Sequence, residues 1–221
     1  ALEEGVRYFL TSLGNPKWVC DRVHAAGGVV YHDITELKWA QKGRDGGVDG
    51  LVAVNREAGG HTGSRDARAL LDEVRGLGLP VVAAGGVGSP EQFKALIDMG
   101  YAGVQLGTRF IATRESMAVE GYKQMIVDSN SGDIVYTPLF SGVHGSYLAG
   151  SIRNAGLDPE HLPTNEAPGE YRNREARPKT WKEIWGAGQG VGNIDDVPGV
   201  AELVDRLERE YLEARRKLCG A

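Results

Sequence analysis

Residues 80–110 have the sequence PVVAAGGVGSPEQFKALIDMGYAGVQLGTRF, and this stretch decides the fold. Its two short apolar runs, 80–87 and 102–106, are typical of parallel strands that are buried on both faces. Between them, Ser89 suits a helix N-cap and Pro90 suits the first helical position. The stretch therefore predicts a strand, a helix and a second strand in that order.

The same alternation extends from this stretch toward the N-terminus. Further apolar runs rich in β-branched residues predict strands at 6–13, 29–34 and 48–54. Helical patterns lie at 16–26, 35–45, 64–77 and 89–99. Strictly alternating strands and helices predict an α/β domain with a parallel sheet. Periodicity alone does not decide between an open doubly wound sheet and part of a β/α barrel.

The pattern changes after residue 110. A helical stretch at 114–128 precedes a region at 129–178 that is rich in glycine, proline and polar residues. We interpret that region as a lid-like excursion, with a surface loop of no functional role as the alternative. The spacing of apolar residues at 199–218 predicts an amphipathic terminal helix that packs on the outside. We therefore expect three parts: barrel units at 1–128, a lid at 129–198 and a terminal helix at 199–221.

Composition narrows the class of protein. The 221 residues suffice for one substantial domain but are few for a complete eight-stranded barrel. A net charge of −5 gives no electrostatic reason to expect nucleic acid or an anionic membrane as partner. Only Cys20 and Cys219 are present, and no signal peptide or membrane span is evident, so we expect a cytoplasmic protein that acts on a small molecule.

Three predicted strands end in glycine-bearing segments, at 56–63, 85–88 and 107–109. Ligands of α/β proteins collect at the carboxyl ends of strands. Glycine lets backbone amides approach a phosphate closely, and a hydroxyl can complete its binding. We predict a phosphate cradle from Gly85, Gly86, Gly107 and Thr108.

His61 lies within one of these segments, between Gly60 and Thr62. A histidine taken alone is more often a structural residue with one satisfied hydrogen bond. Beside a phosphate cradle, however, a neutral imidazole can accept a substrate proton or orient a substrate. We predict that His61 is the catalytic residue, and we expect no metal ligands.

Three motifs carry a resemblance to a known family: EAGGHTG at 57–63, VVAAGGV at 81–87 and GVQLGTRF at 103–110. In the same order and at similar spacings, they resemble central signatures of the nitronate monooxygenases, formerly called 2-nitropropane dioxygenases. Flavin enoyl-ACP reductases and NADH:quinone reductases are related to these enzymes. The resemblance implies a TIM-type (β/α) barrel with a lid-like insertion and a non-covalent FMN cofactor.

The resemblance also implies roles for particular residues. The FMN-binding residues would be Asp33, Gly59, Gly60, Ala84, Gly85, Gly86, Gln105, Gly107 and Thr108. For Asp33, capping of the helix predicted near Thr35 is an alternative role. The segment at 181–192 is also familiar from the family, and its glycines and Gln189 would shape a loop on the substrate side. Trp181 and Trp185, four residues apart, would anchor that loop or simply belong to the core.

Two features depart from the family pattern. Ser12 stands where the best-known nitronate monooxygenases carry a histidine used as the catalytic base, and serine is a poor base on its own. The chain also opens at what resembles the fourth strand, so it lacks the first three βα units. Five strands do not close an eight-stranded barrel, which predicts a homodimer, a swapped arrangement or a further N-terminal segment.

The main hypothesis for function is FMN-dependent oxidation of small nitro compounds or nitronates with dioxygen. The alternative within the same class is a quinone or enoyl-ACP reductase that uses NAD(P)H as reductant. The alternative from another class is a catalytically silent fragment that binds FMN or phosphate. A phosphosugar enzyme would share the phosphate loops, but EAGGHTG at 57–63 argues against it.

Overall fold

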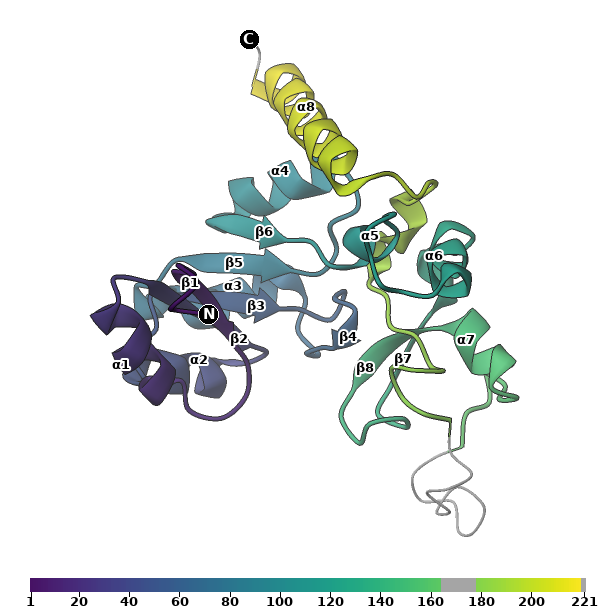
Figure 1. The fold of residues 1–221 in the computed structure, drawn as a ribbon, viewed down its shortest axis with the longest axis horizontal. Helices are drawn as coiled ribbons and strands as arrows, with labels where there is room; N and C mark the ends of the chain where they lie inside the picture. The colour runs from purple at the N-terminus through teal and green to yellow at the C-terminus, as the bar shows by residue number, and fades with distance from the viewer. Residues whose placement is uncertain (164–177, 220–221) are drawn as a thin grey trace. The chain divides into compact units, whose positions relative to one another are not determined.

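A computed structural model describes residues 1–163 and 178–219 (Figure 1). These residues divide into two compact units. The first consists of Ala1–Arg56, Gly63–Gly85 and Phe93–Gln105. The second consists of Glu57–Thr62, Gly86–Gln92 and the described residues from Leu106 onward.

The first unit is built on a five-stranded parallel sheet (Figure 1). The order of strands across the sheet is β1-β2-β3-β5-β6. The strands are β1 Tyr8–Thr11, β2 Val29–Ile34, β3 Gly50–Val54, β5 Val81–Ala84 and β6 Gly103–Gln105. The helices that follow them are α1 Lys17–Ala25, α2 Leu37–Asp45, α3 Ala67–Val74 with the 3-10 turn η1 Arg75–Leu77, and α4 Pro90–Met99. The predicted strand–helix alternation and parallel sheet are confirmed.

Side-chain burial explains why these segments form the sheet. The central strand β3 is buried along most of its length, and Leu51, Val52 and Ala53 are fully inaccessible to solvent. Helix α3 turns Leu70 and Val74 inward, and both are also fully buried. Apolar strands that are covered on both faces are what a parallel sheet requires. The sequence pattern and the packing therefore agree in this unit.

Strand β1 lies at one end of the strand order, opposite β6. Within the described part of the chain, β1 pairs only with β2. Tyr8 and Leu10 on this strand are 56% and 43% exposed. The expectation that further strands or a partner complete the sheet stays a prediction, as does the closed barrel.

The second unit contains a three-stranded antiparallel sheet in the order β4-β8-β7 (Figure 1). Its strands are β4 Gly60–His61, β7 Ile134–Thr137 and β8 Gly145–Leu148. Its helices are α5 Thr108–Ile111, α6 Glu120–Val127, α7 Ala149–Asn154 and α8 Val200–Cys219, with the 3-10 turns η2 Ser131–Asp133 and η4 Gln189–Asn193. Two apolar clusters, one around Leu148 and one around Tyr147, form its core.

Two sequence expectations need correction in this unit. The helix expected at 114–128 begins only at Glu120, because 114–115 form a turn and the chain from there to the extended Val119 is not helical. The stretch at 129–178, expected to be irregular, contains β7, β8 and α7. These elements are four to six residues long, too short to give a clear periodicity. The remainder of that stretch, 164–177, lies outside the described residues.

The terminal helix α8 is amphipathic, as the sequence predicted. Ion pairs attach it to the segment that precedes it in the second unit. Arg206 on α8 bonds both carboxylate oxygens of Asp196 at 2.6 and 3.1 Å, and Arg109 bonds the same carboxylate at 2.5 Å. Hydrogen bonds from Arg206 and then Arg109 lower the pKa of Asp196 to about 2. The Glu115 carboxylate accepts from the backbone N–H of Val200, the first residue of the helix.

Candidate active site

The carboxyl ends of β5 and β6 place three of the predicted FMN residues together in the first unit. Ala84 and Gln105 are register partners on these neighbouring strands. Gly85 follows β5 with a φ of +111°, a conformation that residues with a side chain rarely adopt. Buried Asn55 fixes this turn, because its Nδ2 donates to the Gly85 carbonyl oxygen at 3.1 Å and its N–H donates to Ala84 O at 3.0 Å. A polar residue directly after a buried strand was the available signal for Asn55, which the sequence analysis did not single out.

Asp33 lies near the carboxyl end of β2, also in the first unit. Its Oδ1 atom is buried and has no hydrogen-bond partner among the residues that the structure describes. Burial raises the pKa of this carboxyl from 3.8 to about 6, against the opposing effect of a hydrogen bond with Ser12. The alternative role as a helix cap does not hold, because the N-cap of α2 is Glu36. Asp33 therefore carries a buried acceptor atom that none of the described residues satisfies.

In the second unit, Gly188 brings Gly59 and Thr108 together. The backbone N–H of Gly188 donates to Thr108 Oγ1 at 2.9 Å. A Cβ atom on Gly188 would lie 2.8 Å from the Glu57 carbonyl oxygen and 2.9 Å from the Gly59 nitrogen. A Cβ on Gly59 would in turn lie 2.7 Å from Gly188 N. Glycine at both positions thus lets the backbone around Gly59 lie directly against the backbone around Gly188. The segment at 181–192 therefore contacts the predicted site residues Gly59 and Thr108.

Gly86 and Gly107 differ in their surroundings. Gly86 has a φ of +78°, a backbone conformation that strains any residue with a side chain, and a Cβ there would have to displace the Glu57 carboxylate. Around Gly107, a Cβ would meet nothing within 4 Å. This glycine is exposed and borders open space at the start of α5.

His61 occupies β4, a two-residue strand that pairs with β8. Its exposed ring lies within the second unit beside three side chains that the sequence analysis left without a catalytic role. The Nε2 atom is 2.8 Å from Ser141 Oγ, and the Tyr147 hydroxyl donates to the same Oγ at 3.3 Å. The Trp181 ring stands edge-on to His61 with centroids 5.2 Å apart, and it also contacts Tyr147 at 5.3 Å. Ser141 lies in the turn before β8, and Tyr147 lies on β8 itself. Because the sequence did not predict this hairpin, it gave no sign that the two residues lie beside His61.

Trp181 also has an unusual backbone, with a φ of +70°. Its N–H donates to the Ile184 carbonyl oxygen at 3.0 Å, which closes a turn. Trp185 lies elsewhere, stacked on Tyr122 at 5.0 Å beside the cluster around Leu148. The two tryptophans therefore have different roles: Trp181 borders His61, and Trp185 belongs to the core.

The predicted site residues are thus found in both units. Ala84, Gly85 and Gln105 are brought together in the first unit, as are Gly59 and Thr108 in the second. The combined phosphate cradle stays a prediction. Among residues 1–163 and 178–219, no group of histidine, cysteine and acidic side chains could hold a metal ion. Within the same ranges, no helix is long and apolar enough to cross a membrane.

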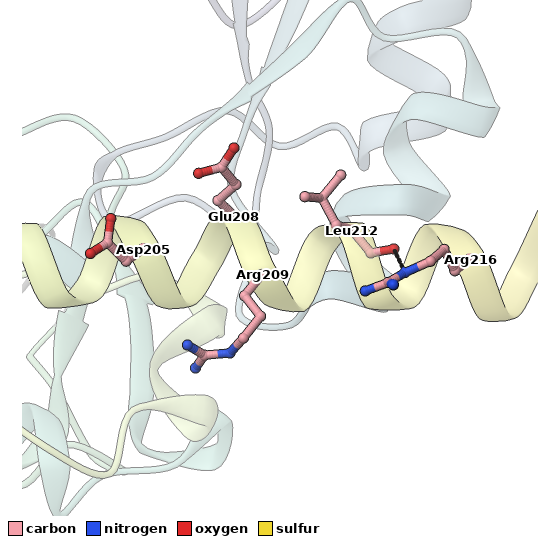
Figure 2. Close-up of a pocket in the computed structure, with 5 residues that line it drawn as sticks. All are labelled: Asp205, Glu208, Arg209, Leu212 and Arg216. Atoms are coloured by element: carbon pink, nitrogen blue, oxygen red, sulfur yellow. Dashed lines mark hydrogen bonds between the residues drawn. The ribbon is translucent and has the colours of Figure 1, made fainter.

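A surface hollow elsewhere does not compete with this site. Figure 2 shows that its lining comes entirely from α8: Asp205, Glu208, Arg209, Leu212 and Arg216. These residues lie along a single helix, and the figure shows them projecting in different directions. None of the residues predicted to bind FMN or substrate is among them.

The parallel sheet with its intervening helices places the protein among the α/β proteins, whose ligands generally bind at the carboxyl ends of strands. Residues 1–210 match the family model for nitronate monooxygenase, so the chain belongs to that family. It is 28% identical over 225 residues to a nitronate monooxygenase of Neurospora crassa, covering 93% of this chain and 60% of that protein. The chain thus spans somewhat more than half the length of that relative.

Two further relatives extend the comparison. A (3aS,4S,5R,7aS)-5-hydroxy-7a-methyl-1-oxo-octahydro-1H-indene-4-carboxyl-CoA dehydrogenase of Rhodococcus jostii is 36% identical over 256 residues, covering 96% of this chain and 72% of that protein. The structure resembles that of a nitroalkane oxidase from Streptomyces ansochromogenes, with a TM-score of 0.76 and 29% identity, covering 98% of this chain and 67% of the other. By their names, these relatives are oxidoreductases.

Proposed function

We propose that this chain provides the cofactor- and proton-handling part of an FMN-dependent oxidoreductase. The observation that supports this most directly is the setting of His61. Its exposed imidazole is hydrogen-bonded on one side to Ser141 and stands beside Trp181, within a glycine-rich segment of the family. Such a group can take a proton from a substrate while the cofactor accepts the electrons.

The residues present fit FMN within each unit. In the first unit, the unpartnered Asp33 Oδ1 offers an acceptor, and Gly85 takes a backbone conformation suited to close approach. In the second unit, the open space at Gly107 leaves room beside the Thr108 hydroxyl. The residues proposed to hold FMN are Asp33, Gly59, Gly60, Ala84, Gly85, Gly86, Gln105, Gly107 and Thr108. Bound FMN would supply a reversible acceptor for two electrons.

For the substrate, we propose a CoA thioester that the protein dehydrogenates. The Rhodococcus jostii dehydrogenase supports this, because its identity of 36% exceeds the 28% of the Neurospora crassa nitronate monooxygenase. Ser12, where the best-known nitronate monooxygenases have a basic histidine, also favours a substrate other than a nitronate. His61 would then take a proton from the substrate.

Oxidation of nitronates with dioxygen is the second candidate. The family model and the likeness to a nitroalkane oxidase support it. His61 would then remove the proton of the nitro compound, since Ser12 has no basic atom for that task. In the alternative reductase, NAD(P)H would reduce the same flavin, and the substrate, a quinone or an enoyl thioester, would be reduced in turn.

Anaerobic mixing of the FMN-loaded chain with single compounds separates these candidates. A hydroxylated alicyclic acyl-CoA should bleach the flavin absorbance, whereas propyl-2-nitronate should leave it unchanged. Bleaching by the nitronate alone would support the second candidate instead. Bleaching by NADH alone would support the reductase. A colourless protein that FMN cannot tint would overturn the proposal and indicate a silent fragment.

The His61→Ala variant tests the proton-handling role. We expect it to retain FMN and to lose about 100-fold in turnover, the scale of general acid–base assistance. His161→Ala is the matched control, because His161 is an exposed histidine that pairs with Asp158 rather than with Ser141. Equal turnover of the two variants would show that His61 has only a structural role.

A further inference from the structure

Ser141 Oγ is the centre of a small hydrogen-bond cluster within the second unit. It lies 2.8 Å from His61 Nε2, 2.9 Å from the Val143 carbonyl oxygen and 3.3 Å from the Tyr147 hydroxyl. The Val143 N–H makes a longer contact of 3.4 Å with the same oxygen. Tyr147 is fully buried, and burial raises the pKa of its phenol, so this hydroxyl stays protonated and can donate.

The proton count of this cluster determines the state of the histidine. A serine hydroxyl has one proton to donate, and a carbonyl oxygen can only accept. If Ser141 donates to the Val143 carbonyl, its oxygen can accept from Tyr147 and from a proton on His61 Nε2. If it instead donates to Nε2, the 2.9 Å contact with Val143 O holds no proton. Only the first arrangement keeps both of the short contacts as hydrogen bonds.

We propose that Ser141, itself hydrogen-bonded by Tyr147, is a positioning residue that keeps the proton of neutral His61 on Nε2 and leaves Nδ1 as the basic atom. None of the described residues forms a hydrogen bond to Nδ1. The catalytic meaning of this assignment rests on the proposed function. The position of the proton itself does not depend on it.

The packing of the ring supports the same assignment. Trp181 meets the His61 ring at an interplanar angle of 82°, and it contacts Tyr147 as well. Two neighbours of the imidazole, one aromatic and one polar, thus restrict its orientation. A base held in this way needs little reorganisation when a substrate arrives, which is how a second residue assists a histidine in catalysis.

Nitrogen-15 NMR of the full chain, with labelled histidine and no substrate, tests the proposal. In its neutral form, His61 should show a protonated Nε2 and an unprotonated Nδ1. His161 provides an internal reference of the opposite kind, because its Nδ1 lies 2.8 Å from the Asp158 carboxylate, which only accepts. The His61→Ala variant assigns the signal. An unprotonated Nε2 in the wild-type chain would overturn the proposal.

Two variants at Ser141 sharpen the test. Ser141→Ala should shift the ratio of tautomers of His61 by about fivefold, which corresponds to the loss of one ordinary hydrogen bond. Ser141→Thr keeps a hydroxyl and should restore the wild-type ratio. The His161 signal should be unchanged in both, and a backbone amide spectrum like that of the wild-type chain would show that the fold persists. An unaltered His61 spectrum in Ser141→Ala would overturn the positioning role, even though the wild-type tautomer had been assigned correctly.

The spectra and the turnover measurements can fail separately. If His61→Ala turns over substrate normally, the proposed function is wrong, whichever nitrogen carries the proton. If the tautomer is the other one while His61→Ala is inactive, the histidine is catalytic but Ser141 does not position it as proposed. If Ser141→Ala does not fold, the wild-type spectrum still shows which nitrogen of His61 carries the proton. Tyr147→Phe then tests the hydrogen bond that Tyr147 donates to Ser141.

Discussion

The two units hold their candidate residues in place by different means. In the first unit, large apolar side chains such as Leu51 and Leu70 fill the space around a parallel sheet, and the strand ends follow from that packing. In the second unit, Gly59 and Gly188 bring backbone directly against backbone. One part of the site therefore depends on side-chain volume, whereas the other depends on the absence of a side chain. Removing side-chain volume should therefore damage the first unit, and adding side-chain volume should damage the second.

Removing volume from the sheet should have the largest effect. We expect Leu51→Ala to lower the free energy of unfolding by about 3 kcal/mol, because it leaves a cavity at a fully buried position. Leu10→Ala on β1 is the matched control, since Leu10 is 43% exposed. Urea denaturation monitored by circular dichroism measures both. Equal losses for the two variants would contradict the account of the first unit.

Adding volume should damage the second unit, to a somewhat smaller extent. Gly188→Ala should cost about 2 kcal/mol, because its Cβ would lie 2.8 Å from the Glu57 carbonyl oxygen and the backbone must move. Gly76→Ala serves as control, since a Cβ there meets nothing within 4 Å. Hydrogen exchange should show faster opening around 186–190 in the Gly188 variant. Protection equal to that of the wild-type chain would mean that the close approach is not required.

The smallest expected effect is a gain in stability at Asp33. The folded chain retains the proton of this carboxyl up to about pH 6, whereas an ordinary carboxyl loses it near 3.8. Ionisation therefore lowers stability as the pH rises through this window, and Asp33→Asn removes that loss. A rise of the pKa from 3.8 to about 6 corresponds to about 3 kcal/mol as an upper bound, and because Asp33 is only partly buried we expect a gain of about 1 kcal/mol at pH 7.5 and none at pH 3.5.

Denaturation of the FMN-free chain at both pH values measures this gain. Asp45→Asn is the control, because Asp45 is exposed at the end of α2. The same Asp33 variant keeps an acceptor oxygen but loses the negative charge, so it should bind FMN more weakly if the ionised carboxylate accepts from the cofactor. A gain that is equal at both pH values would show that burial of the charge is not its cause.

The sequence predicted the first unit well for a physical reason. Its strands are largely apolar and a glycine follows the end of each helix, so local pattern and tertiary burial agree. The predicted strand at 29–34 coincides with β2 Val29–Ile34. Ser89 was predicted to cap α4, and its Oγ accepts from the Gln92 N–H at 3.3 Å.

The second unit was predicted less well because its structure depends on contacts between residues that are distant in sequence. His61 could be selected from its glycine neighbours, but its partner Ser141 is 80 residues away. The hairpin that carries Ser141 has strands of four residues, which give no clear period. The resemblance pointed to the segment at 181–192, yet only the structure separates Trp181 beside His61 from Trp185 in the core.

The left-handed backbone of Trp181 has a consequence for recognising related sites. An amino acid with a Cβ atom at a φ of +70° is disfavoured by on the order of 1–3 kcal/mol, a penalty that glycine would avoid. The contacts of the indole with His61 and Tyr147 must offset this penalty. Glycine would suit the backbone of position 181 best, but it would lose the contacts that the indole of Trp181 makes. In a relative, an aromatic side chain after the turn at Thr180 would mark the same arrangement, and a glycine there would indicate that the histidine works in different surroundings.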